Sequence, residues 1–306
     1  MIALITGANG FIGRHLTDYL LDKNISIKGT VRDPNCQITS AVDKYCTGDI
    51  NENTCWQASL EGIEVIYHLA GTVHRPNLTD PQVYKASIED ATNKLALEAS
   101  KAGVKKFIYF SSLHVYGMDV DLDIITESTP KNPHTPYGRA KLAAENKLQN
   151  LADKSSMEVI IIRPPLVYGK GVKGNFAQLI KLVNLMPILP FGCATQKRSF
   201  IGIDNLVDFA YLCSHHPKAA NQIFNISDDN DLNTQELCQK LARFLGKKQL
   251  LLPIPRKFMG LFLSLLNKQE LYNKLFESVR LDINQAKKML DWQPRYTVDE
   301  QLLKTL

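Results

Sequence analysis

The chain has 306 residues, of which 44% are hydrophobic and 22% are charged. This composition is typical of a folded protein with a large core, and it excludes disordered, collagen-like and coiled-coil chains. The net charge of +5 arises from 36 basic and 31 acidic residues spread along the sequence, with no dense basic block of the kind that binds nucleic acid. At roughly 100–200 residues per domain, the length predicts one large domain or two unequal ones.

The first half of the sequence alternates short β-branched runs with helical patterns. Strands are predicted at Ile2–Thr6, Ser26–Val31, Val65–Ala70, Lys106–Ser111 and Glu158–Arg163, and helices at Ile12–Leu21, Gln82–Lys101 and Tyr137–Ala152. Such alternation implies βαβ units, in which helices cover both faces of a parallel sheet. The predicted fold class is therefore α/β, with a doubly wound parallel sheet.

After the prolines at 164 and 165 the elements become shorter and more interrupted. Strands are predicted at Phe200–Ile203 and Ile223–Ile226, and helices at Thr234–Leu245, Lys257–Leu266 and Asn284–Leu290. We assign residues 1–169 to the sheet domain, and expect residues 199–227 to return to it. Residues 170–198 and 228–306 are assigned to a smaller second lobe.

Six scattered cysteines and one apolar stretch bear on the cellular environment. The cysteines lack metal-ligand spacing, and the first apolar run ends after one strand length, which argues against a secretory signal. The longest apolar stretch, Phe258 to Leu266, is shorter than the roughly 20 residues that span a bilayer. We interpret it as a buried amphipathic helix, with peripheral contact to a membrane as the alternative. We expect a cytoplasmic protein with free thiols, no integral membrane segment and no metal site.

A glycine pattern lies between the first predicted strand and the first predicted helix. Glycine at such positions permits a tight turn, close approach of the backbone to a pyrophosphate, and packing of the helix on the strand. The pattern predicts dinucleotide binding rather than a simple turn, because the elements on both sides are correct. The residues assigned to this contact are Gly7, Asn9, Gly10, Phe11, Ile12 and Gly13.

The residues after the second predicted strand bear on which dinucleotide binds. A cation there suits the 2′-phosphate of NADP, whereas an acidic side chain suits the free ribose hydroxyl of NAD. Arg32 comes first after the strand and Asp33 comes next. We therefore favour NADP(H), with NAD(H) as the alternative if Arg32 is only a surface residue.

Two further segments follow predicted strands and are assigned to the cofactor. Asp49 is placed to accept a hydrogen bond from the adenine amino group, with Ile50 beside it. After the next strand come Leu69, Ala70 and Gly71, where the small residues at 70 and 71 let the backbone lie against the cofactor.

A proton-transfer group is predicted from two places in the sequence. Tyr137 and Lys141 are four residues apart in a helical pattern, so their side chains share one face. A phenol has an ordinary pKa near ~10, so it needs an adjacent cation to act as an acid/base at neutral pH. Ser112 follows a predicted strand at the carboxyl edge of the sheet, where its hydroxyl can hold a substrate oxygen beside the phenol.

Seven motifs thus occur in order, namely TGANGFIG, GDI, HLAG, SSLHVYG, YGRAK, RPPLVYG and RSFIGIDN. They extend over nearly the whole chain and resemble the extended short-chain dehydrogenase/reductase family, more narrowly its nucleotide-sugar epimerase/dehydratase branch. The resemblance implies a Rossmann domain that carries the cofactor and a C-terminal lobe that holds a nucleoside-diphosphate sugar. It also implies a two-fold homodimer through the helices predicted at 82–101 and 137–152.

The resemblance also implies roles for single residues. Tyr137 would be the acid/base, Lys141 its activator and Ser112 the hydroxyl on the substrate, while Pro164 would pass near the nicotinamide. Among the substrate contacts, Arg198 would bind the diphosphate.

The resemblance implies two further substrate contacts. Asn175 would touch phosphate or uridine, or cap a helix, and His114 would contact substrate or have no role.

The chain departs from the family pattern at two places. Dehydratases of the family carry an Asp-Glu pair where this chain has Leu113 and His114, so dehydration is not expected. Ser87 stands where the family often has a helical asparagine, which weakens a proton relay at that place.

Several activities are compatible with this set of residues. A 4-epimerase and a 4-keto reductase acting on a UDP-hexose or UDP-N-acetylhexosamine need the same side chains. Arg32 favours reduction with NADPH, and the stretch from RPPLVYG to GVKGNF resembles the reductases of O-antigen and capsule pathways. The general resemblance to sugar 4-epimerases favours the epimerase. An NADPH-dependent reductase of small ketones and a non-catalytic dinucleotide-binding scaffold are the alternatives outside this class.

Overall fold

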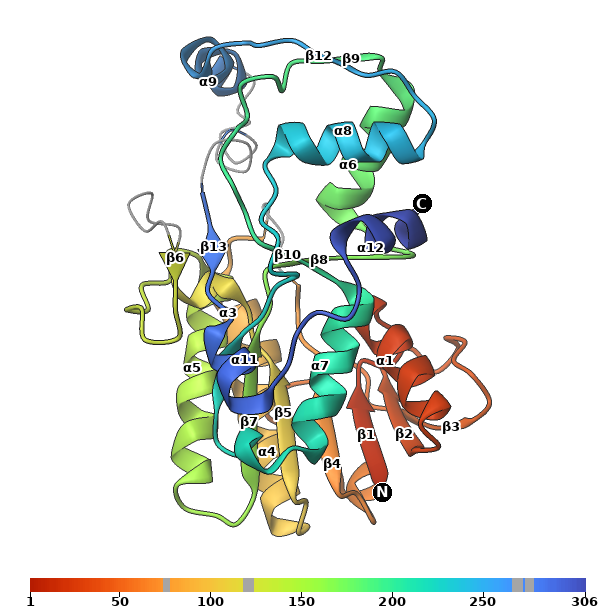
Figure 1. Ribbon diagram of the computed structural model, residues 1–306. Helices are drawn as coiled ribbons and strands as arrows, with labels where there is room; N and C mark the ends of the chain where they lie inside the picture. Colours follow the sequence, from red (N-terminus) through yellow and green to blue (C-terminus); the bar gives the residue numbers. More distant parts are fainter. Residues whose placement is uncertain (74–77, 118–123, 266–271, 273–277) are drawn as a thin grey trace.

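The computed structural model describes residues 1–73, 78–117, 124–265, 272 and 278–306. At its centre is a seven-stranded sheet in the order β11-β7-β5-β4-β1-β2-β3, with all neighbouring strands parallel (Figure 1). Its strands are β1 (Ile2–Thr6), β2 (Ser26–Val31), β3 (Val42–Cys46), β4 (Val65–His68), β5 (Lys106–Phe110), β7 (Glu158–Arg163) and β11 (Ile223–Asn225). The predicted doubly wound α/β class is confirmed, and the strand order reverses between β1 and β4.

Helices cover both faces of this sheet. One face packs on α1 (Phe11–Asp22), α7 (Ile203–His215) and α11 (Asn284–Leu290), and the short helix η3 (Pro217–Ala219) follows α7. The other face packs on α2 (Gln57–Leu60), α3 (Pro81–Tyr84), η1 (Lys85–Asp90), α4 (Ala91–Lys101) and α5 (Pro136–Ala152). Strands buried on both faces read as continuous apolar runs, as at 160–162.

The single helix expected over Gln82–Lys101 is a succession of three helical segments. Between α3 and α4 lies η1, one turn of π-helix. Within it, Ser87 Oγ lies 2.7 Å from the Val83 carbonyl oxygen and 2.7 Å from Thr72 Oγ1. A serine hydroxyl bonded to the carbonyl four residues earlier competes with the helical hydrogen bonds, which accounts for the altered helix here.

The remaining elements form a second region above the carboxyl edge of the sheet (Figure 1). It contains α6 (Gly174–Leu185), α8 (Thr234–Phe244), α9 (Arg256–Leu265) and α12 (Val298–Thr305). Three parallel pairs of short strands accompany them: β8 (Leu166–Tyr168) with β10 (Phe200–Gly202), β9 (Ile188–Leu189) with β12 (Leu250–Leu251), and β6 (Ile124–Ile125) with β13 (Arg280–Leu281). Strand β10 thus pairs outside the main sheet. Of the two elements that follow it, α7 packs on a face of the main sheet and β11 is one of its strands.

The apolar stretch that begins at Phe258 is only partly buried. Met259 packs in the core of the second region, but Phe258 and Leu261 are 68% and 64% exposed. The expected buried helix is therefore wrong for these two residues, while Leu266, its last residue, lies outside the described part of the chain. The described residues contain no helix long and apolar enough to cross a membrane.

Candidate active site

The glycine turn joins β1 to α1 with the geometry of an anion site. Gly7 has φ +70°, and a Cβ on Gly13 would lie 2.2 Å from the Gly7 carbonyl oxygen, so both positions require glycine. Gly10 is the N-cap of α1 and makes no side-chain cap, which leaves the first backbone N–H groups of the helix for an anionic ligand. This turn fits the pyrophosphate of a dinucleotide.

The ends of β1 and β4 are bonded together where the strand order reverses. Thr6 Oγ1 accepts hydrogen bonds from the backbone N–H groups of Leu69 (3.1 Å) and Ala70 (3.0 Å), which is why β4 ends at His68 and not at Ala70 as expected. His68 is fully buried between Thr6 and Thr92, and burial lowers its pKa to about 3. It is neutral and structural, and it holds the Leu69–Gly71 segment beside the glycine turn.

Arg32 and Asp49 face each other at the outer end of β2 and β3. Their side chains are 3.5 Å apart and are 74% and 85% exposed. Asp33 accepts a hydrogen bond from the Asn35 backbone N–H at 2.8 Å and so stabilises its own turn. Ile50 packs against the sheet core. Arg32 is therefore the cation at this end, and a ligand phosphate would compete with Asp49 for it.

The predicted proton-transfer residues come together at the carboxyl edge of the sheet. Lys141 is buried, and its Nζ donates a 2.7 Å hydrogen bond to the Phe110 carbonyl oxygen at the end of β5. The same Nζ lies 6.0 Å from the centre of the Tyr137 ring. Ser112 is the N-cap of the short helix η2 (Leu113–Val115), where its Oγ accepts from the His114 N–H.

A glycine lets the helix that carries Tyr137 approach the Ser112 loop. A Cβ on Gly138 would lie 2.4 Å from the His114 carbonyl oxygen. The Tyr137 ring makes edge-to-face contacts with His114 at 5.6 Å and with Tyr84 at 5.9 Å between ring centres. These contacts fix the direction of the phenol. They also give His114 a structural contact with Tyr137.

Burial sets the protonation of the phenol and the ammonium. It raises the pKa of Tyr137 to about 12, partly opposed by a hydrogen bond with Ser112. Burial also lowers the pKa of Lys141 to about 7, and the Glu145 carboxylate opposes this by favouring the charged form. Near neutral pH the phenol is thus protonated, and the lysine beside it can gain or lose its charge.

Behind Lys141 lies a buried ionic network. Arg163 Nε donates to Glu145 Oε1 at 2.9 Å and Nη2 to Oε2 at 2.5 Å, and both side chains are about 1% exposed. Arg163 also donates to the Tyr116 hydroxyl at 2.6 Å, which in turn donates to Asn225 Oδ1 at 2.8 Å. Tyr137, Lys141 and Glu145 are spaced four apart and share one face of α5.

The remaining predicted site residues lie on separate elements. The Pro164 carbonyl oxygen accepts from the Leu113 N–H at 3.1 Å, which places it beside the Ser112 loop. Asn175 is exposed in the first turn of α6, whose N-cap is Lys173, so the cap alternative for Asn175 is wrong. Arg198 is half-buried and bridges Leu232 and Val279 through its backbone.

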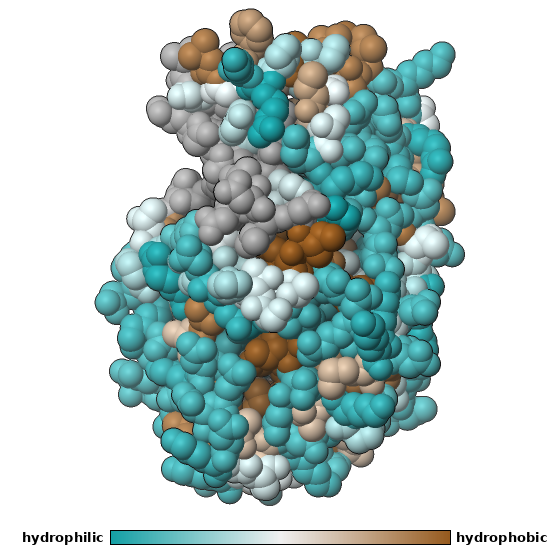
Figure 2. Space-filling view, turned by 60° about the vertical axis from the view of Figure 1, so that its left-hand side comes forward, coloured by the Kyte–Doolittle hydropathy of each residue, from teal (hydrophilic) through white to brown (hydrophobic). Residues whose placement is uncertain are grey.

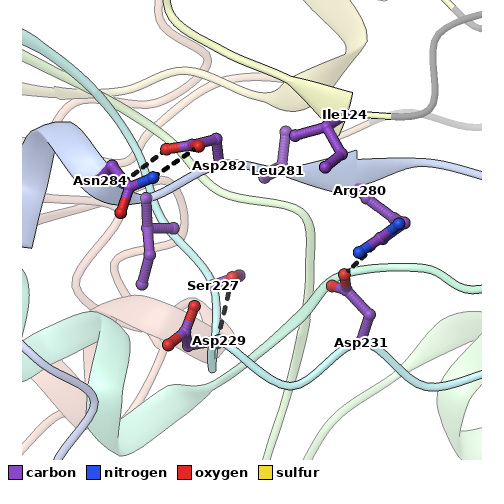
Figure 3. A pocket seen from close by; sticks show the side chains of 9 residues that line it. Ile124, Ser227, Asp229, Asp231, Arg280, Leu281, Asp282 and Asn284 are labelled. Carbon is purple, nitrogen blue, oxygen red and sulfur yellow. Dashed lines mark hydrogen bonds and ion pairs between the residues drawn. The ribbon is translucent and has the colours of Figure 1, made fainter.

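A pocket of about 210 Å³ lies next to the Arg198 segment (Figure 3). Three aspartates line it, and two of these have basic partners, Asp231 with Arg280 at 2.9 Å and Asp229 with Lys287 at 2.5 Å. The pocket is walled by β13, β6, the loop at 227–231 and the start of α11. Because carboxylates repel phosphate, we do not assign the diphosphate to it.

Sequence reasoning missed Thr6, Tyr84, Glu145 and Tyr116. Glu145 could have been found, because it continues the four-residue spacing of Tyr137 and Lys141. The contact of Tyr84 with Tyr137 joins residues far apart in the sequence and leaves no pattern. Leu113, where dehydratases have an acid, is buried in a small apolar cluster and cannot donate a proton.

Comparisons with known proteins agree with this geometry. Residues 3–227 match the NAD dependent epimerase/dehydratase family. A UDP-glucose 4-epimerase of Vibrio cholerae is 39% identical, with 97% of this chain and 92% of the relative covered. An N-acetyl-alpha-D-glucosaminyl-diphospho-ditrans,octacis-undecaprenol 4-epimerase of Escherichia coli O157:H7 is 27% identical, with 84% and 77% covered.

Among solved structures, the UDP-glucuronic acid 4-epimerase of Bacillus cereus in complex with NAD is similar. It has a TM-score of 0.81 at 24% identity, with 100% of this chain and 95% of that chain covered. At this identity the likeness shows the fold, which the two proteins share over all of this chain and most of the other.

Proposed function

The chain belongs to the NAD dependent epimerase/dehydratase family, and we propose that it interconverts or reduces nucleotide-activated sugars at C4. The sugar would be a UDP-hexose or UDP-N-acetylhexosamine. The observation that carries the proposal is the convergence of Ser112, Tyr137 and Lys141 at the sheet edge, beside a glycine turn in which a Cβ would collide with backbone. The 39% identity to a UDP-glucose 4-epimerase supports the choice of substrate.

In this proposal the residues of the site have separate tasks. As a phenolate, favoured by the charge of Lys141, Tyr137 takes the proton of the C4 hydroxyl when hydride leaves C4, and as a phenol it returns a proton when hydride is added. Ser112 holds the C4 oxygen by a hydrogen bond. Lys141, anchored to the Phe110 carbonyl, supplies positive charge beside the phenol and contacts ribose hydroxyls. The dinucleotide, when bound, supplies or accepts the hydride at C4.

The outer contacts are proposals of the same kind. The dinucleotide would be held by the turn at 7–13, by 69–71 and by Asp49, Ile50 and Pro164. Arg198 would bind the sugar diphosphate, with Asn175 and His114 as further contacts. Of these, His114 has the best support, because its ring contacts Tyr137 directly.

Epimerisation is the leading activity, and reduction of a 4-keto sugar is the second candidate. The named activity of the 39% identical relative favours the epimerase. Arg32 favours the reductase, because an exposed cation at the end of β2 suits the 2′-phosphate of NADPH. Buried Leu113 argues against dehydration in either case.

The relatives differ in the group that carries the sugar, which is a nucleotide in one and diphospho-undecaprenol in another. One relative acts on a sugar linked to diphospho-undecaprenol, at 27% identity. We propose a nucleotide carrier for this chain, because the relative named for a UDP-sugar is more similar and is covered more completely.

The deciding experiment combines two measurements on the purified protein. Mass spectrometry of the nucleotide released on denaturation identifies the cofactor. Incubation with UDP-glucose or UDP-N-acetylglucosamine, followed by chromatography, should then show the C4 epimer without net cofactor consumption. A 4-keto reductase would instead oxidise NADPH with a 4-keto sugar only. Turnover of small ketones alone, or of nothing, would contradict the proposal.

We also propose a two-fold homodimer in the cytoplasm. Helices α4 and α5 lie side by side on one face of the sheet (Figure 1), where two copies could join them into a four-helix contact. All six cysteines are free thiols, as suits a reducing compartment. Light scattering at high protein concentration should give twice the chain mass of 34.4 kDa, and a monomeric mass would contradict the dimer.

A further inference from the structure

Exposed apolar side chains gather at one end of the second region, on what we call the tip surface (residues 181–190 and 245–261). The described part of the chain exposes fifteen large hydrophobic side chains, and seven of them lie on these two segments. The seven are Leu185, Met186, Ile188, Leu250, Leu252, Phe258 and Leu261. Most other exposed apolar residues occur singly, as is normal on a protein surface. A patch of seven is typical of an interaction site.

The two segments form one continuous surface. Ile188 and Leu250 are directly opposite each other in the β9/β12 pair, and Gln249 Nε2 donates to the Met186 carbonyl at 3.0 Å. Helix α9 follows β12 and buries Met259, so Phe258 and Leu261, three residues apart, share its outer face. Figure 2 shows apolar side chains gathered at the top of the molecule, where Figure 1 places α9, β9 and β12.

The charge on this surface has one sign. Its two segments contain five basic residues and no Asp or Glu. The five are Lys181, Lys247, Lys248, Arg256 and Lys257, all exposed. The tip surface is therefore positively charged, although the net charge of the whole chain is only +5.

We propose that the tip surface docks on the surface of an anionic lipid bilayer. Aliphatic and phenylalanine side chains that project beside lysines and arginines are the combination that binds at the headgroup level, where apolar groups enter the acyl boundary and cations attract lipid phosphates. The surface lies at the end of the second region away from the main sheet (Figure 1), so docking leaves Tyr137 and the glycine turn uncovered. This inference does not depend on which sugar is the substrate.

A second copy of the chain is the other possible occupant, and the charges oppose it. In a two-fold contact the same surface meets itself. The basic side chains at 181, 247, 248, 256 and 257 would then face their counterparts with no acidic residue on either segment to pair with them. Like charges brought together across an interface are costly.

The test is vesicle flotation with the full-length protein. Vesicles of phosphatidylcholine alone are compared with an equal mixture of phosphatidylcholine and phosphatidylglycerol, at low and at high salt. We expect binding to the anionic vesicles only, weakened by salt because the attraction is partly electrostatic. Neutralising three tip cations in K247Q/K248Q/K257Q should weaken partitioning about a hundredfold.

Matched controls separate this surface from the rest of the molecule. K101Q/K131Q/K218Q removes three exposed cations elsewhere and should bind as the unchanged protein does. Likewise Phe258→Ser with Leu261→Ser should abolish binding, whereas Leu97→Ser with Leu303→Ser should not. Sugar turnover without vesicles should be the same in all four variants, which shows that they are folded.

Insertion can be observed directly by fluorescence. Both natural tryptophans, Trp56 and Trp292, are buried beside the main sheet, so Phe258→Trp adds one exposed reporter at the tip. Its emission should shift to the blue with anionic vesicles, and that of Leu303→Trp should not. Absence of flotation, or equal loss in tip and control variants, would overturn the proposal. Self-association that the Phe258→Ser, Leu261→Ser variant abolishes, without vesicle binding, would assign the surface to a second copy and overturn it too.

Discussion

The two ends of the proposed cofactor site, its proposed catalytic end and its proposed adenosine end, are built in opposite ways. At the catalytic end, Glu145 and Arg163 are bidentate partners with almost no exposure, and Lys141 is held by a backbone carbonyl. At the adenosine end, Arg32 and Asp49 are 3.5 Å apart and mostly in solvent. A buried charge is costly to leave without its partner, whereas an exposed pair contributes roughly 0–1 kcal/mol. The side chains proposed for catalysis are therefore fixed by the fold, whereas the pair proposed to set cofactor preference can be changed with little effect on stability.

The largest effect is expected at the phenol. Tyr137→Phe keeps the ring contacts with Tyr84 and His114 but cannot transfer a proton. Turnover should fall by about 10²–10⁴-fold, the usual contribution of a general acid/base. Steady-state rates measure this, and unchanged dinucleotide binding shows that the site is intact. Normal turnover by a folded variant would end the proposed mechanism.

The buried pair should come next, measured as stability. Glu145→Gln or Arg163→Met leaves one buried charge without its partner, which costs about 3–5 kcal/mol. The double variant Glu145→Met, Arg163→Met should recover most of that loss in urea unfolding. As a control, Glu64→Gln weakens the exposed pairs of Glu64 with Lys105 and with the N-terminus, and should cost far less than either buried variant. Equal losses in the buried and exposed variants would contradict the contrast between the two ends.

Lys141 should make stability depend on pH. Its pKa is lowered to about 7 by burial, from an ordinary 10.5, so between these values the unfolded chain binds a proton that the folded chain does not. Unfolding free energy therefore rises with pH across this window. Lys141→Met removes this rise. The unfolding free energy of the variant, compared with that of the unchanged protein at the same pH, should therefore decrease by a few kcal/mol between pH 7 and pH 10. Thermal unfolding at several pH values measures it, and a constant difference would show that Lys141 stays charged.

The smallest effect is expected at the adenosine end. If Arg32 binds the 2′-phosphate, Arg32→Ala should weaken NADPH by about one to two decades, since a charge-assisted hydrogen bond is worth ~1.5–3 kcal/mol. NADH, which lacks that phosphate, should lose little. Titration with both cofactors measures the ratio, and Asp49→Asn, which frees Arg32 from its partner, should act in the opposite direction. Equal losses for both cofactors would remove the case for NADP and strengthen the epimerase.

Most of the sheet was predictable because its central strands carry local signals, whereas β3, a largely polar and exposed strand, was given no range. Short apolar runs bounded by turn residues mark β1, β2, β5 and β7, and the glycine turn is fixed by backbone contacts that only glycine permits. The prediction of one continuous helix over Gln82–Lys101 was wrong at η1, because the hydroxyl of Ser87 competes for the helical hydrogen bonds. The apolar periodicity of the sequence does not reveal such a change from α-helix to π-helix.

The predicted site was limited in the same manner. Tyr137 and Lys141 share a helix, so their spacing predicts their proximity, and Glu145 extends that spacing by another four residues. Arg163, the partner of Glu145, lies on β7, and Tyr116 and Asn225 lie on other segments. Only the tertiary fold shows that these side chains meet in one network. The exposure of Phe258 also escaped prediction, because an apolar helix looks the same in sequence whether its outer face is covered or open.

The path of the last residues has a consequence for synthesis of the chain. Ile283, Leu290 and Trp292 complete the apolar core on one face of the main sheet, where Trp292 contacts Phe209 at 4.8 Å between ring centres. Domains commonly fold as they emerge from the ribosome, beginning at the N-terminus. Helices α1 and α7 cover part of this face earlier, but the part around Phe209 that these residues cover stays open until nearly the whole chain has been made. A nascent or truncated chain that stops before residue 283 therefore exposes the apolar surface around Phe209, and it becomes a natural client for chaperones.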